Sequence, residues 1–363
     1  MKPMIVKRFW GLISSQQGPG GYPACNPNRA SMEIRPAVLD AYIFVRNMRK
    51  FEPWSVKRRL GRLLRIIPAF RRQLDRRHLG RHLRQAYPVE YALYKGTHAS
   101  QSSKSSILHF TVNKAATQYV KKILFKLGEE NGMHCAAPDS LAFNSGFPSL
   151  SGLRSKKIHK FQKVFKPKGY VYSSFNGAIP WIENLHLYRI IVFVRDPRDV
   201  ITSLYYSLAY SHPLPSELSP DRETFIRNRK QILQSGIDGF AIQAAESIAG
   251  DFRSLISLIG RKAPDERRAS NILITRYEQM VQGFDDWLDE VIVHCDLMVS
   301  DETRSELAED ARQIADRFSE GERQDSHLRK GRPGDYLEKL KPKTVSKLNA
   351  IFDEVLLFFE YRR

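Results

Sequence analysis

Short apolar runs alternate with stretches of helical periodicity from residue 105 onward. The runs at 105–112 (SSILHFTV), 188–194 (YRIIVFV) and 271–275 (NILIT) are typical of buried strands. The first run is followed by TQYVKKILFKLG, a predicted helix with Thr117 as its N-cap and Gly128 as its end. Strands that alternate with helices predict an α/β domain, in which a mainly parallel sheet is flanked by helices.

The first hundred residues have a different pattern. Residues 57–84 contain eleven Lys or Arg and a single acid, Asp75, and their leucines and isoleucines recur at helical spacing on both sides of Pro68. This pattern predicts two short basic amphipathic helices. We therefore divide the chain into a basic, partly irregular and helical N-terminal extension, residues 1–100, and an α/β domain, residues 101–363.

The chain as a whole is basic, since 58 Lys and Arg against 39 Asp and Glu give a net charge of +19. Such an excess favours anionic partners. Residues 57–84 either lie on an anionic membrane or another polyanion, or form a packed extension whose arginines are solvated. Nucleic acid is not the expected partner, because no interleaved aromatic platform for stacking bases accompanies these arginines.

The cysteines and the apolar segments exclude several classes of protein. Cys25, Cys135 and Cys295 are far apart and have no zinc-site spacing, which is typical of isolated thiols in a reducing compartment. No apolar run is long enough to span a bilayer, and the N-terminus is a poor secretory signal. We therefore predict a cytoplasmic protein whose contact with membranes, if there is one, is peripheral.

Two segments with phosphate-binding chemistry follow predicted strands, at the sheet edge where ligands bind in α/β folds. In residues 112–119 a helix N-terminus supplies backbone N–H groups, Lys114 an ammonium and Thr117 a hydroxyl, although the glycines of a Walker A loop are absent. In the second segment Arg195 ends a strand, and Ser203 lies about two turns into the next helix. Each of these alone is also compatible with an ordinary strand-to-helix junction.

Two further segments belong to the same pattern. Tyr277 follows the third strand, where an aromatic ring either stacks on a base or simply packs. Downstream, Arg329, Lys330 and Arg332 lie in a loop with Gly331, before a predicted helix at residues 343–359. A basic loop of this kind is suited to closing over a highly charged ligand.

The four segments together resemble the sulfotransferase family that uses 3′-phosphoadenosine 5′-phosphosulfate (PAPS). A Lys-Ser-Gly-Thr-Thr-Trp type loop binds the 5′-phosphosulfate in that family, and the corresponding residues here are Lys114, Ala115, Ala116, Thr117, Gln118 and Tyr119. An Arg followed eight residues later by a Ser holds the 3′-phosphate, as Arg195 and Ser203 are spaced here. The segment from Tyr277 is similar to the family's Tyr-Glu-Asp-Met, whose Tyr lies by the adenine, and the family's Arg-Lys-Gly signature is matched by Arg329, Lys330 and Gly331.

The resemblance implies a nucleotide-kinase-like sulfotransferase fold and transfer of a sulfuryl group from PAPS to a hydroxyl or amine. Lys114 would be catalytic, neutralising the leaving phosphate, and no metal would be needed because Lys and Arg replace Mg²⁺. The acceptor would be a small molecule or a glycan, including lipid-linked compounds. Alternative hypotheses are a P-loop kinase-like phosphotransferase and a basic adaptor that binds membranes or polyanions without catalysis.

The sequence departs from the family at the general base. Cytosolic relatives have a catalytic His about 22 residues before the 3′-phosphate Arg, and that position here is Ser173. No base is assigned, and the candidates are His109, Glu129, Glu130, His134 and His159. A second departure is the pair Ala115 and Ala116 in place of glycine, since alanine favours negative φ.

Overall fold

The computed structural model describes residues 81–144, 150, 161–212, 214, 222–260, 271–319 and 331–362. Five strands form one sheet in the order β2-β3-β1-β4-β5, and every neighbouring pair is parallel. The strands are β1 (Ile107–Thr111), β2 (His134–Ala136), β3 (Tyr170–Asn176), β4 (Arg189–Val194) and β5 (Ile272–Arg276). The predicted α/β class and parallel sheet are therefore confirmed.

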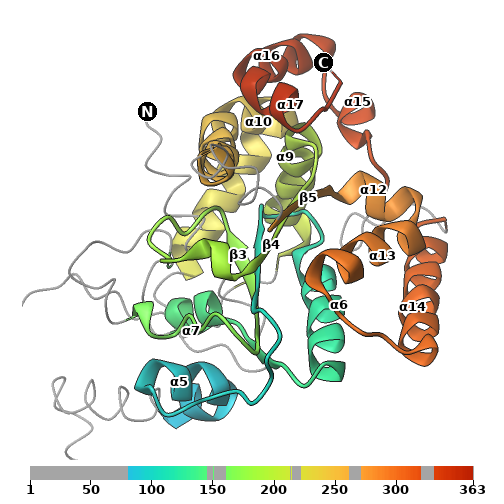
Figure 1. The fold of residues 1–363 in the computed structure, drawn as a ribbon. Coiled ribbons are helices and arrows are strands. Elements are labelled where there is room, and N and C mark those ends of the chain that lie inside the picture. Colours follow the sequence, from blue (N-terminus) through green and yellow to red (C-terminus); the bar gives the residue numbers. More distant parts are fainter. Residues whose placement is uncertain are drawn as a thin grey trace, which may run out of the picture.

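Helices cover both faces of this sheet (Figure 1). One face is covered by α6 (Thr117–Glu130) and α13 (Phe284–Cys295), and α14 (Asp301–Ser319) lies outside these two helices. The other face is covered by α7 (Pro138–Asn144), α9 (Pro197–Tyr206) and α10 (Arg222–Gly260), which is bent at Gly236. Because both faces are covered, every residue of β1 is buried, as its uninterrupted apolar run predicted.

The remaining described elements are short helices that precede, connect or follow the strands. They are α5 (Pro88–Lys95), a 3₁₀ turn (Leu185–Leu187), a π-helix (Ser207–Ser211), α12 (Tyr277–Gln282), α15 (Asp335–Lys339), α16 (Pro342–Ile351) and α17 (Asp353–Phe358). None of the described helices is both long and apolar enough to cross a membrane.

The three predicted strands are present as β1, β4 and β5, but both predicted ends of α6 were wrong, and a second predicted helix is divided in two. Gly128 lies inside α6 rather than at its end. Glycine is needed at this position because a Cβ there would lie 2.4 Å from Cγ2 of Val171 in β3. Ala116 rather than Thr117 is the N-cap of α6, in a left-handed conformation. The predicted helix at 343–359 is divided between α16 and α17.

The N-terminal extension is described only from residue 81. Within it, α5 packs on the domain, because Leu93 is buried in the common core and the carboxylate of Glu90 accepts a 2.6 Å hydrogen bond from the Ala137 amide. The two basic helices predicted within residues 57–84 lie largely outside the described residues. The domain boundary at residue 100 stays a prediction.

Candidate functional site

The loop between β1 and α6 has the backbone geometry of an anion-binding turn. The φ angle is 67° at Lys114 and 53° at Ala116, and Ala115 between them is not in the left-handed region. Residues that alternate in this way turn successive amide N–H groups toward one concave side. The hydroxyl of Thr117 donates to the carbonyl of Val112 at 3.2 Å, which closes the loop at the helix N-terminus. The expectation that alanine would keep a negative φ was thus wrong at Ala116.

The guanidinium of Arg195 lies directly against this loop. Its Nη1 donates to the main-chain carbonyl of Lys114 at 3.2 Å, although the two residues are 81 apart in the sequence. Its Nη2 lies 3.8 Å from the carboxylate of Asp199, and its Nε is buried with no hydrogen-bond partner among the described residues. A buried guanidinium N–H without a partner is a donor that a bound anion can satisfy.

Tyr277 joins the third and fourth sequence segments to Arg195. The guanidinium lies over the Tyr277 ring, 4.4 Å from its centre, and the Tyr277 hydroxyl donates to the carbonyl of Gly331 at 2.5 Å. Gly331 has a φ of 64°, and a Cβ there would lie 2.1 Å from the Phe318 ring. Residue 331 therefore requires glycine both for its conformation and for space.

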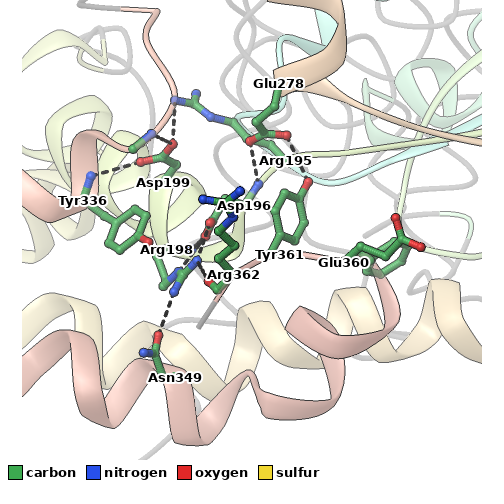
Figure 2. Close-up of polar contacts among 12 residues, drawn as sticks. Arg195, Asp196, Arg198, Asp199, Glu278, Tyr336, Asn349, Glu360, Tyr361 and Arg362 are labelled. Carbon is green, nitrogen blue, oxygen red and sulfur yellow. Dashed lines mark hydrogen bonds and ion pairs between the residues drawn. The ribbon is translucent and has the colours of Figure 1, made fainter.

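Asp199 connects Arg195 to the start of α15 (Figure 2). Its two carboxylate oxygens accept hydrogen bonds from the amides of Gly334 at 2.8 Å and Tyr336 at 3.0 Å. The spacing of four residues between Arg195 and Asp199 could have indicated this ion pair in the sequence. Its contacts with residues 334–336 could not have been found from the local sequence, because those residues are more than a hundred positions away.

Arg198 is a structural residue rather than a ligand-binding one. It is only 1% exposed, and its guanidinium makes a bidentate pair with Asp196, with Nε–Oδ1 and Nη2–Oδ2 distances of 2.9 and 2.6 Å. Its Nη1 also donates to Asn349 of α16 at 2.8 Å (Figure 2). Asp196 in turn is the N-cap of α9, with Pro197 in the first turn. The Asp-Pro pair therefore fixes the turn that carries Arg195.

Burial and neighbouring charges shift the pKa of Arg195 and of the two carboxyl groups beside it. Burial alone lowers the pKa of Arg195, but Tyr277, Asp199 and Glu278 outweigh that effect, and the net pKa is raised. Burial also raises the pKa of Asp199 and of Glu278. The guanidinium is therefore permanently cationic, while the carboxyl groups beside it are easier to protonate when an anion approaches.

The other predicted site residues are distributed around this centre. Ser203 lies one turn after Asp199 on the same face of α9 and is half-buried. Gln118 is exposed in the first turn of α6, and Tyr119 packs on Phe284 of α13 with ring centres 6.4 Å apart. Arg329 and Lys330 lie outside the described residues.

His109 is a poor candidate for the general base, because it is fully buried within β1. One ring nitrogen is 2.8 Å from the hydroxyl of Ser173, and the ring packs edge-on against Phe193. Burial lowers its pKa from the usual 6.5 to about 3. The imidazole is therefore neutral at physiological pH and out of reach of an acceptor.

The other described base candidates lie far from Lys114. Glu129 and Glu130 are at the last turn of α6, about 20 Å from its first turn given the helical rise. His134 begins β2 and so lies at the amino edge of the sheet, opposite the loop that contains Lys114. His159 lies outside the described residues. The general base remains unassigned.

Solved structures that match this chain include the following three. The mouse sulfotransferase SULT7A1 complexed with PAP is 17% identical, with a TM-score of 0.45 over 74% of this chain and 89% of that chain. Retinol dehydratase with androsterone and the inactive cofactor PAP is 12% identical, with a TM-score of 0.42 over 69% and 80%. Retinol dehydratase with retinol and PAP is 12% identical, with a TM-score of 0.43 over 75% and 88%. No significant match is found among curated protein sequences.

The described residues thus form an α/β fold in which a loop with two left-handed residues and a buried arginine lie together at the carboxyl edge of a parallel sheet. Residues 183–358 match the family model described as a sulfotransferase domain. This match confirms, for residues 183–358, the family predicted from the sequence motifs. The matched segment includes Arg195, Ser203 and Tyr277, whereas the loop at 112–119 precedes it.

Proposed function

We propose that this sulfotransferase moves a sulfuryl group from PAPS to a hydroxyl or amine of a small molecule or glycan. In this proposal the loop from Lys114 to Tyr119 binds the 5′-phosphosulfate. Arg195, Ser203, Arg329 and Lys330 hold the 3′-phosphate, which distinguishes PAPS from ATP. Tyr119 and Tyr277 contact the adenine, and the main chain of Gly331 completes the site.

The observation that carries the proposal is the 3.2 Å hydrogen bond from Arg195 to the carbonyl of Lys114. It brings together two cationic residues from separate strand ends. Tyr277 then connects Arg195 to Gly331, so that parts of all four sequence segments meet. A ligand with two separated phosphate groups matches this arrangement, because one group can occupy the loop and the other the guanidinium.

Sulfuryl transfer from such a site depends on positioning and on charge. Negative charge grows on the leaving 5′-phosphate as the sulfur–oxygen bond breaks, and the ammonium of Lys114 and the amides of residues 115–118 stabilise it. The new bond joins the sulfur to the acceptor oxygen or nitrogen, whose proton passes to a base that is not yet identified. Cationic side chains carry out the charge stabilisation, so the proposal includes no metal.

Contact between residues 57–84 and an anionic membrane stays a prediction, as does a cytoplasmic location. A glycan or membrane-associated acceptor would be consistent with that basic segment.

Calorimetric titration with 3′-phosphoadenosine 5′-phosphate (PAP), beside ATP, tests the proposal. We expect PAP, the product that PAPS leaves, to bind at least about 100-fold more tightly than ATP, since charged hydrogen bonds to the 3′-phosphate are lost with ATP. Lys114→Ala and Arg195→Ala should each weaken PAP binding by about tenfold or more.

Gln118→Ala is the control, since its side chain is exposed in the first turn of α6 and only its backbone amide is proposed to bind the nucleotide. Its PAP affinity should stay within about twofold of wild type. Equal affinity of the wild type for ATP and PAP would contradict the proposal and favour a phosphotransferase.

A further inference from the structure

Residues 359–362 form a strap that contacts Arg198, which follows β4, and Arg276, the last residue of β5. Two buried or half-buried arginines hold its main chain. Arg276 donates to the carbonyls of Phe359 at 3.1 Å and Glu360 at 3.3 Å. Arg198 donates to the main-chain carbonyl of Arg362 at 2.6 Å. The strap is therefore fixed to the same turn that carries the nucleotide-site arginine.

Tyr361 extends this connection through a side chain. Its hydroxyl donates to Oε2 of Glu278 at 3.1 Å, and Oε1 of Glu278 accepts the amide hydrogen of Asp196 at 3.0 Å. Asp196 directly follows Arg195, so a continuous path of hydrogen bonds leads from the strap to the backbone that aims the guanidinium. Figure 2 shows these two hydrogen bonds on separate oxygens of the Glu278 carboxylate.

The environment of this path makes each of its bonds costly to lose. Burial raises the pKa of Glu278, and it raises the pKa of Tyr361 well above its usual range. The phenol thus stays protonated and remains a donor. A buried carboxylate that loses one of its two donors must recover a partner by moving, and its movement displaces the Asp196 amide.

We propose that Tyr361 is a positioning residue of the nucleotide site, which orients Arg195 toward the 3′-phosphate through Glu278 and the main chain of Asp196. The inference rests on the proposed function, because the orientation of Arg195 matters only to a ligand that bears that phosphate. A role in 3′-phosphate recognition differs from a role in folding, since only the former depends on which nucleotide is bound.

The test compares PAP with adenosine 5′-phosphate, which lacks the 3′-phosphate, in wild type and in Tyr361→Phe. The variant keeps the ring, which lies 5.9 Å from the Arg276 guanidinium, and removes only the hydroxyl. We expect PAP to bind about fivefold to tenfold more weakly, and adenosine 5′-phosphate to bind within about twofold of wild type, because only the 3′-phosphate meets Arg195. Glu278→Gln should give the same selective loss, and the double variant should lose no more than either single one.

Glu360→Gln is the control within the strap, because the Glu360 side chain is 82% exposed and lies 3.7 Å from Arg276. It should leave both affinities unchanged, and thermal unfolding should show that all variants are folded. Unchanged PAP binding in Tyr361→Phe, or an equal loss for both nucleotides, would overturn the inference. A wild type that binds PAP no better than adenosine 5′-phosphate would instead overturn the proposed function itself.

Discussion

Ala116 has a backbone conformation that alanine rarely adopts, since its φ of 53° brings its Cβ close to the following carbonyl. The loop uses this conformation to direct amides toward one side. Because glycine adopts it without steric cost, Ala116→Gly should raise the free energy of unfolding by up to about 1 kcal/mol. Urea denaturation measures this, and PAP affinity should be retained. A destabilised variant would show that the methyl group, which packs against the core, outweighs the strain.

His109 is a second residue whose environment has a measurable consequence. Its pKa is lowered from 6.5 to about 3 by burial, so the unfolded chain binds a proton there between these values and the folded chain does not. Stability contributed by the neutral ring is therefore complete above pH 6.5 and is lost as the pH falls toward 3. The loss amounts to about 1.4 kcal/mol per pH unit at most.

Urea denaturation of wild type and His109→Gln between pH 7 and 4 separates this effect from others. The wild type should lose stability more steeply on acidification than the variant. Asp139 acts in the opposite sense, because burial raises its pKa to about 6, but it is present in both proteins and cancels in the difference. Parallel pH profiles for the two proteins would contradict the buried neutral state of His109.

At the scale of elements, the close approach of α6 to β3 depends on Gly128. A Cβ at this position would lie 2.4 Å from Cγ2 of Val171 and 3.7 Å from the sulfur of Cys135. Gly128→Ala should therefore lower the free energy of unfolding by about 1–3 kcal/mol, although alanine favours helices. Thermal or urea denaturation gives the difference.

Gly250→Ala in α10 is the matched control, because a Cβ there would have nothing within 4 Å. This helical change should stabilise the protein by up to about 1 kcal/mol. Adding Val171→Ala to Gly128→Ala should recover part of the loss. If Gly128→Ala were as stabilising as Gly250→Ala, the helix would not be fixed on β3 at this distance.

The elements that the sequence predicted well are those with a strong local pattern. The strands β1 and β4 are continuous apolar runs, which a sheet covered on both faces requires. β2 has only three residues, and β3 contains the polar pair Ser173 and Ser174, so neither has a clear apolar period. Gly128 was misplaced because its reason, space for Val171, is a contact between elements.

The site could be predicted in part for a reason of topology. Parallel strands place their carboxyl ends at one edge, which brings together the residues after β1, β4 and β5 once the sheet is inferred. The position of Gly331 beside Tyr277 and the strap at 359–362 depend on side-chain contacts between distant segments, and no local periodicity reports such contacts. The buried state of His109 likewise depends on the helices that cover its strand.

At the scale of the whole molecule, one ligand is proposed to bridge the loop at 112–117 and the turn at Arg195. A crystal structure of the full chain with PAP tests this most directly. The account predicts the 5′-phosphate on the amides after Lys114, and the 3′-phosphate within hydrogen-bond distance of Arg195 and Ser203. A nucleotide bound at another surface, or one whose 3′-phosphate points away from Arg195 into solvent, would contradict it.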